Sequence, residues 1–210
     1  SPLAICVDGY AKVPGTDYEY SCRNYDLMGR ITLEEMDAES ANDIWGWTDP
    51  VTAKEYALVG MSNGTSFVDI TAPDSPVYVG RLATHSSNST WRDIKVYNNY
   101  AFIVSEASGH GMQVFDLTVL RTFGGTPITF SETAHYGEFG NAHNIFINED
   151  TGFAYAIGTS TCGPGGLHIV DISNPSLPAK SACVSDPSTG RSNTGYVHDV
   201  QCVVYNGPDS

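Results

Sequence analysis

An internal repeat of about 50 residues is the feature that most constrains how this chain can fold. Four short segments begin alike, with a polar residue, then Asp or Asn, then a β-branched residue. They are Asn42-Asp43-Ile44, Arg92-Asp93-Ile94, His143-Asn144-Ile145 and His198-Asp199-Val200. Their middle residues are separated by 50, 51 and 55 positions. One structural unit therefore recurs along the chain.

Each complete unit continues with further runs that have the β-branched and aromatic composition of strands. Second strands are predicted at 56–60, 100–104 and 153–157, and third strands at 66–70, 113–117 and 168–172. A fourth strand is predicted at 77–80 in the first unit and at 180–184 in the third. Four short antiparallel strands per unit form one blade of a β-propeller. The sequence thus predicts an all-β chain with about three such blades and the start of a fourth.

Two regions follow from the repeat boundaries. Residues 1–40 form a polar N-terminal segment, and residues 41–210 hold the blades. The predicted repeats are 42–91, 92–142, 143–197 and an incomplete 198–210. A propeller needs at least about four blades to close. We therefore expect the remaining blades to come from the rest of a longer parent chain or from a second chain.

Five cysteines indicate the compartment, and none has the spacing of a zinc site. Cys6 and Cys22 flank the N-terminal loop, while Cys162 and Cys183 flank one predicted hairpin unit. Both pairs are predicted to form loop-closing disulfides, which require an oxidising environment. Cys202 is left over, either as a free thiol or as a link to a segment beyond this chain.

The charge balance excludes some partners and favours an exported protein. The chain has 24 acidic and 10 basic residues, a formal charge of −14, so nucleic acid and anionic membranes would repel it. No apolar stretch reaches the roughly 20 residues that span a bilayer. Asn63 and Asn88 begin N-glycosylation sequons. We expect a secreted or extracellular acidic glycoprotein, with attachment to the cell surface as a further option.

Several motifs resemble a known family. The run Leu-His-Ile-Val-Asp-Ile-Ser-Asn-Pro at 167–175 is similar to the LVIVD repeat. The wider chain, including 43–47, 91–99, 105–116, 140–145 and 198–202, resembles the choice-of-anchor B proteins. The resemblance implies an exported β-propeller, attached through varied C-terminal anchors, that continues into more blades with a partner for Cys202. It implies no catalytic residues.

The repeat starts are the first candidate site, because the first strand of each blade lines the central channel of a propeller. The residues expected there are Asp43, Asp93, His143, Asn144, His198 and Asp199. Oxygen ligands would suit calcium, and imidazoles a transition metal. In the alternative interpretation, these residues cap strands and hydrogen-bond neighbouring blades, with Arg92 paired to Asp93 or another carboxylate.

Two further groups are candidate binding residues. Glu106 and His110 lie in a glycine-containing turn, where they serve either binding or turn geometry. No nucleophile elbow accompanies them. Trp45, Trp47 and Trp91 lie near blade starts and either stack on a sugar or protein partner or form core.

The sequence therefore predicts a secreted or cell-surface binding and assembly module, an adhesion or scaffold protein that contacts proteins or surface glycans. No catalytic motif is evident in it. The alternative is a metal-dependent hydrolase or oxidase that uses Asp93, His143, His198 and Asp199 in the channel. In either case the cofactor expected for the channel, if one is bound, is calcium or a transition metal.

Overall fold

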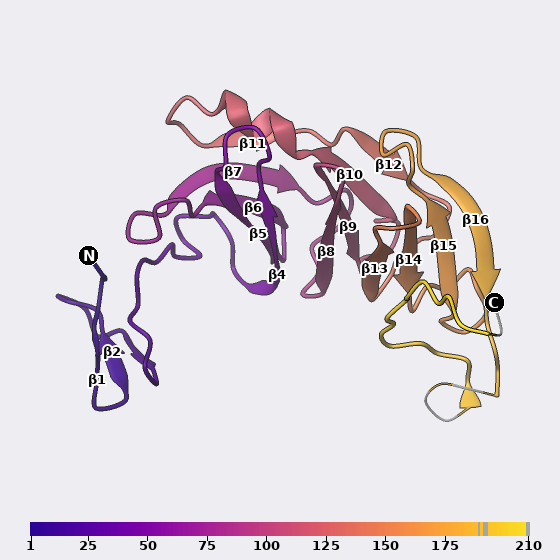
Figure 1. The fold of residues 1–210 in the computed structure, drawn as a ribbon, viewed down its shortest axis with the longest axis horizontal. Coiled ribbons are helices and arrows are strands. Elements are labelled where there is room, and N and C mark those ends of the chain that lie inside the picture. The colour runs from indigo at the N-terminus through magenta and orange to yellow at the C-terminus, as the bar shows by residue number, and fades with distance from the viewer. Residues whose placement is uncertain (189, 191–192, 209–210) are drawn as a thin grey trace.

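The structure is a computed structural model that describes residues 1–188, 190 and 193–208. Within these residues it contains strands β1 to β16 and one short helix, η1 (Leu117–Thr122), which is too short to cross a bilayer. The all-β prediction is confirmed. A small sheet near the N-terminus precedes three larger sheets that follow one another along an arc (Figure 1).

The first blade is an antiparallel meander. Its strands are β4 (Ala41–Thr48), β5 (Glu55–Met61), β6 (Gly64–Asp69) and β7 (Val77–Ala83). The loop between β4 and β5 is organised by Asp49, whose buried carboxylate accepts hydrogen bonds from Val51 N at 3.0 Å and Arg121 Nη2 at 2.6 Å. All four strands predicted for this repeat are present.

The second blade repeats the pattern. Its strands are β8 (Arg92–Tyr97), β9 (Tyr100–Ser105), β10 (Met112–Asp116) and β12 (Ala134–Tyr136). Asn98 and Asn99 connect β8 to β9 with φ values of 47° and 64°. Asn tolerates this left-handed region, and a two-residue turn of this kind matches the twist of the paired strands.

The third blade also has four antiparallel strands. They are β13 (Asn144–Asn148), β14 (Phe153–Ile157), β15 (Leu167–Asp171) and β16 (Ala179–Val184). A disulfide joins Cys162, in the β14–β15 loop, to Cys183 on β16. It therefore ties this loop to the outer strand.

A strand exchange joins the first two blades. After β10 the chain runs through η1, adds β11 (Ile128–Phe130) parallel to β7 of the first blade, and returns as β12. Gly80 on β7 permits this approach, because a Cβ there would collide with the backbone of Ile128. The repeat pattern does not reveal β11, since its pairing lies outside its own repeat.

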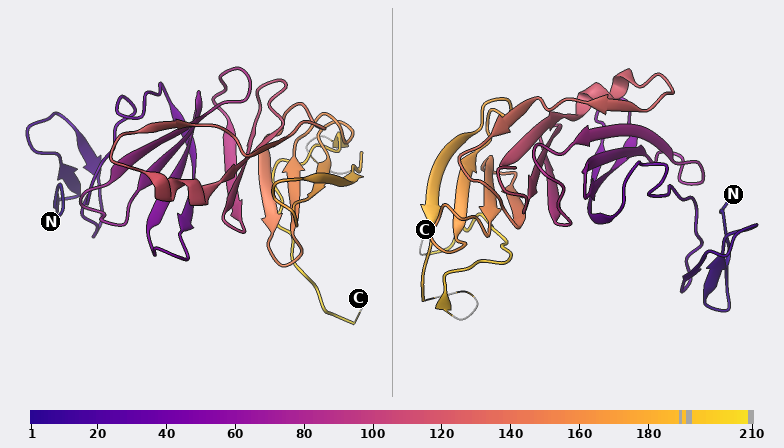
Figure 2. Two further views of the ribbon diagram at one scale, coloured as in Figure 1. Left: turned by 90° about the horizontal axis from the view of Figure 1, so that it is seen from above. Right: turned by 180° about the vertical axis from the view of Figure 1, so that it is seen from behind.

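Apolar side chains fill the junctions between blades. Phe67 of the first blade stacks on Phe115 of the second, with 4.7 Å between ring centroids. At the next junction, Phe102 and Val114 of the second blade lie in one cluster with Ala154 of the third. Each blade is thus stabilised mainly by burial against its neighbour. The side-by-side order of the blades can be followed in Figure 2.

Within the described part of the chain, one face of the first blade has no equivalent blade in front of it. Four repeat positions that face the preceding blade are almost completely buried: Ile94 and Leu117 at the first junction, Ile145 and Ile172 at the second. Their counterparts on the first blade, Ile44 and Ile70, are 61% and 36% exposed. The described blades therefore form an open arc.

The N-terminal segment covers only part of this face. It contains a three-stranded sheet, β1 (Cys6–Val7), β2 (Tyr10–Lys12) and β3 (Glu19–Ser21), closed by the Cys6–Cys22 disulfide. Further along, Met36 packs against Met61 and Val68 of the first blade. The cover does not extend over Ile44.

Candidate functional site at the inner strands

A cavity of about 420 Å³ lies where the inner strands of the three blades begin. Strands β4, β8 and β13 and the chain around His198 form its walls. The lining residues are Asn42, Asp43, Trp91, Arg92, Asp93, His143, Asn144 and His198. The structure thus brings together five of the six residues that the repeat predicted for the channel, because equivalent positions of successive blades face the same axis.

Asp43 and Asp93 each form a hydrogen bond to the backbone of the following blade. Asp43 Oδ2 accepts a hydrogen bond from Ile94 N at 3.2 Å, and Asp93 Oδ2 accepts one from Ile145 N at 2.8 Å. Asp93 Oδ1 also accepts from Lys95 Nζ at 2.5 Å. The contacts to Ile94 N and Ile145 N are the inter-blade hydrogen bonds of the alternative interpretation. They satisfy backbone donors that burial would otherwise leave unpaired.

The two carboxylates also influence each other. Burial, followed by the hydrogen bond and negative charge of Asp93, raises the pKa of Asp43 to about 6. The positive charge of Lys95 acts in the opposite direction. Ionised Asp43 is therefore less favourable here than in an unfolded chain.

At the third repeat start, the amide of Asn144 takes the place that the carboxylates of Asp43 and Asp93 have in the first two. Asn144 Nδ2 donates to the backbone oxygen of His198 at 3.0 Å. Asp199, by contrast, is exposed, accepts from Val200 N at 2.8 Å and does not line the cavity. Its predicted place in the channel is corrected here. The described residues of 193–208 form no strand, so no sheet pairing directs this side chain inward.

Glu106, His143 and His198 form a connected chain beside the cavity. Glu106 Oε1 lies 2.6 Å from His143 Nδ1, and His143 Nε2 lies 3.0 Å from His198 Nε2. An ionised carboxylate can only accept, so the proton in the first contact belongs to Nδ1 of His143. The sequence did not connect Glu106 to His143, because they lie 37 residues apart on different blades.

Arg92 lines the cavity, and its guanidinium joins two blades. Its buried guanidinium donates to Met61 O at 2.9 Å, to Thr84 Oγ1 at 2.9 Å and to His110 Nε2 at 2.8 Å. Burial lowers its pKa to about 10. The expected pairing with Asp93 or another carboxylate is wrong, because a carbonyl, a hydroxyl and an imidazole take up the guanidinium donors. Adjacent side chains of a strand also point to opposite faces, which separates Arg92 from Asp93.

His110 is likewise a buried structural residue. It is fully buried, and burial lowers its pKa to about 4. A neutral ring explains how Nε2 accepts from Arg92 while Nδ1 donates to Gly111 O at 3.0 Å. The prediction that His110 contacts a ligand is therefore corrected.

The three tryptophans differ in their roles. Trp47 is buried in the junction of the first two blades, and its Nε1 donates to Asn99 Oδ1 at 3.1 Å. It is core and not a binding residue. Trp45 is 41% exposed with Lys95 Nζ 4.5 Å from the ring centroid, and Trp91 is 52% exposed beside the cavity. These two remain predicted contacts for a protein or glycan.

A second pair of histidines lies close to His110. The rings of His85 and His135 stack with centroids 3.6 Å apart and planes 5° from parallel. His85 Nδ1 lies 3.0 Å from Glu132 Oε1, and His135 Nε2 donates to His110 O at 2.7 Å. The pair is thus held by stacking and by flanking hydrogen bonds.

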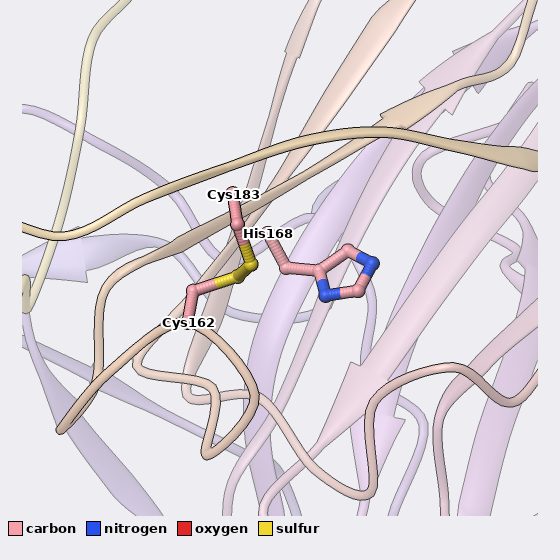
Figure 3. Close-up of side chains that lie close together, drawn as sticks. All are labelled: Cys162, His168 and Cys183. Carbon is pink, nitrogen blue, oxygen red and sulfur yellow. A yellow bond between two sulfur atoms is a disulfide. The ribbon is translucent and has the colours of Figure 1, made fainter.

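Cys162, His168 and Cys183 form another close group, which the sequence did not single out as one site (Figure 3). Both nitrogens of His168 are engaged, Nδ1 with Thr161 Oγ1 at 2.9 Å and Nε2 with Tyr136 OH at 2.8 Å. Figure 3 shows the two sulfurs joined to each other. Because metals bind thiolates, the disulfide form offers no sulfur ligand.

Both predicted disulfides, Cys6–Cys22 and Cys162–Cys183, are present. Such bonds suggest an extracytoplasmic compartment. Cys202 is a free, half-buried thiol whose pKa is raised by burial. Its link to a further segment stays a prediction.

The predicted glycosylation sites differ in accessibility. Asn88 is exposed, whereas Asn63 is half-buried and its Nδ2 donates to Asp37 O at 2.7 Å. A glycan at either position stays a prediction, and Asn88 is the more accessible of the two.

Repeated four-stranded antiparallel sheets, with a cavity at their inner strands, define this chain as a protein of propeller blades. The model of the LVIVD repeat family matches residues 50–84, 90–109 and 140–186. The chain belongs to the LVIVD repeat family, and its repeats form the blades. No curated protein matches the chain significantly.

Proposed function

We propose that this protein is an exported module of the choice-of-anchor B kind, secreted or held at the cell surface, which assembles with other proteins through the faces of its blades. The LVIVD repeats, the two disulfides and the resemblance of the longer motifs to that group support this proposal. Its binding surface lies on the blades at the two ends of the arc.

The exposure of Ile44 carries the proposal. At the two internal junctions the equivalent isoleucines are almost completely buried against the preceding blade. Ile44 is 61% exposed, and Ile70 beside it is 36% exposed. Apolar side chains that are exposed at positions normally buried in a blade junction indicate a surface that binds a partner.

The opposite end of the arc carries a complementary surface. On the second blade, Phe102 and Val114 face the following blade and are fully buried. Their counterparts on the third blade, Tyr155 and Ile169, are only half-buried. Among the described blades, the first thus has no preceding neighbour and the third has no following one.

We propose a second copy of the chain as the source of the neighbouring blade at each end. Its third blade would pack against the first blade of its partner, as the blades do within one chain. Such head-to-tail contacts close into a ring when the rotation per subunit allows it. Two copies of the three described blades would fall within the 4 to 8 blades that propellers typically contain.

Photo-crosslinking tests this association. A photoreactive phenylalanine derivative is placed at Ile44, and unlabelled protein is mixed with ¹⁵N-labelled protein before irradiation. We expect isotopically mixed adducts that join position 44 to β14 or β15 of another copy. The same probe at Val119, an exposed apolar position on η1, is the control. Adducts no more frequent at position 44 than at position 119, or none that mix isotopes, would refute the proposal.

A further inference from the structure

Two imidazoles from separate segments meet at the cavity. His143 comes directly before β13, and His198 lies on the extended chain beyond the third blade. Their Nε2 atoms are 3.0 Å apart. One proton can lie between two such nitrogens, so at least one of them directs a lone pair toward the other. Two nitrogen donors therefore converge on nearly the same point.

This spacing matches the bite of one metal ion. Two imidazole nitrogens, each about 2.0–2.1 Å from a metal, lie roughly 2.9 Å apart at adjacent square-planar positions and roughly 3.3 Å apart in a tetrahedron. The observed 3.0 Å lies between these values and nearer the first. We infer that His143 and His198 bind a divalent transition-metal ion, and that Cu²⁺ binds most tightly, as imidazole ligands and square-planar geometry favour.

Glu106 provides a carboxylate that accepts a hydrogen bond from the second ring nitrogen of His143. Metal ligands of this kind commonly donate the second ring N–H to a carboxylate, which fixes the tautomer and the ring orientation. Glu106 Oε1 lies 2.6 Å from His143 Nδ1. His143 therefore presents Nε2 as the ligand atom, and Glu106 acts as a positioning residue.

The cavity leaves room for the other ligands. It measures about 420 Å³ and is also lined by Asp43 and Asp93. With two protein nitrogens bound, the remaining positions would be taken by water or by a small external ligand, as in metal sites with open positions. The site is independent of the blade association proposed above, since neither histidine lies at Ile44 or on the third blade's strands.

Other histidines lack this arrangement. The rings of His85 and His135 stack in parallel, so their in-plane lone pairs do not converge on one point. His168 has both nitrogens engaged by hydroxyl groups. The His85–His135 pair is thus a matched control, with the same residue types and a comparable inter-ring distance.

Copper titration with spectroscopy tests the inference. Cu²⁺ is added to the purified protein in excess Mg²⁺, which occupies weak acidic sites, and binding is followed by calorimetry and electron paramagnetic resonance. We expect one equivalent of Cu²⁺ with the nitrogen hyperfine pattern of two imidazoles. His143→Ala and His198→Ala should each remove this pattern. The double variant H85A/H135A should leave both affinity and spectrum unchanged.

Glu106→Gln distinguishes positioning from ligation. This variant should keep the two-nitrogen spectrum and bind Cu²⁺ roughly 10–100-fold more weakly, the usual effect of an outer-shell carboxylate. His198→Ala is expected to fold normally, because Asn144 bonds the backbone oxygen of residue 198, and urea unfolding verifies this. A wild-type spectrum without two imidazole nitrogens would overturn the inference. So would an equal loss of affinity in H85A/H135A and in His143→Ala.

Discussion

Three equivalent isoleucines allow one substitution to be compared in three environments. Ile94 and Ile145 are almost completely buried at blade junctions, and Ile44 is 61% exposed. Replacing Ile with Ala removes three carbons, at about 0.8 kcal/mol of transfer free energy for each buried one. With the cavity that remains, we expect Ile94→Ala and Ile145→Ala each to lower the free energy of unfolding by about 3 kcal/mol. Ile44→Ala should lower it by less than about 1 kcal/mol.

Urea unfolding checks these values, with far-UV circular dichroism for the strands and fluorescence for the buried Trp47. It is performed on dilute protein, so that contacts between copies do not contribute. For a chain of this size a loss of about 3 kcal/mol also lowers Tm by roughly 6–12 °C. Leu177→Ala, at an exposed position, controls for side-chain deletion alone. A cost at position 44 equal to that at position 94 would refute the equivalence argument, as would a cost below about 1 kcal/mol at position 94.

Two pH dependences follow from the buried titratable groups. The folded-state pKa of Asp43, about 6, lies above its ordinary 3.8, so its ionisation weakens the fold as pH rises through this window. Asp43→Asn should be more stable than the wild type at pH 7.5 and not at pH 4, and equal urea midpoints at pH 7.5 would contradict this. The folded-state pKa of His110, about 4, lies below its ordinary 6.5, so stability is lost as pH falls through that interval. His110→Gln should flatten the acid side of the stability profile, and an unchanged acid slope would count against a neutral buried ring.

Much of the fold follows from patterns that are local in sequence. The strand runs and turns repeat every 50 to 55 residues, and each predicted strand of the first and third blades is present. Alternation along a strand also explains why the side chains of Arg92 and Asp93 have different partners, Met61 O for the guanidinium and Ile145 N for the carboxylate. Applied strictly, that rule would have excluded the Arg92–Asp93 pair from the sequence alone.

Contacts between distant segments could not be read in the same way. Strand β11 pairs with β7 of another repeat. The repeat pattern of the sequence does not predict this pairing between repeats. Glu106 meets His143 only because the second and third blades pack side by side. The burial of Trp47 and His110 depends on the neighbouring blade as well.

By itself, the sequence determined the repeat, most strands within the blades, the two disulfide pairs and five of the residues that converge on the inner strands. These features depend on composition, on the alternation of side chains and on a fixed repeat length, and all three can be read directly from the sequence. Only the tertiary structure decided which carboxylates bridge blades, which histidines are buried and neutral, and which two imidazoles face each other. Those outcomes depend on packing between residues 18 to 55 positions apart, where burial and geometry, rather than local propensity, set the free energy.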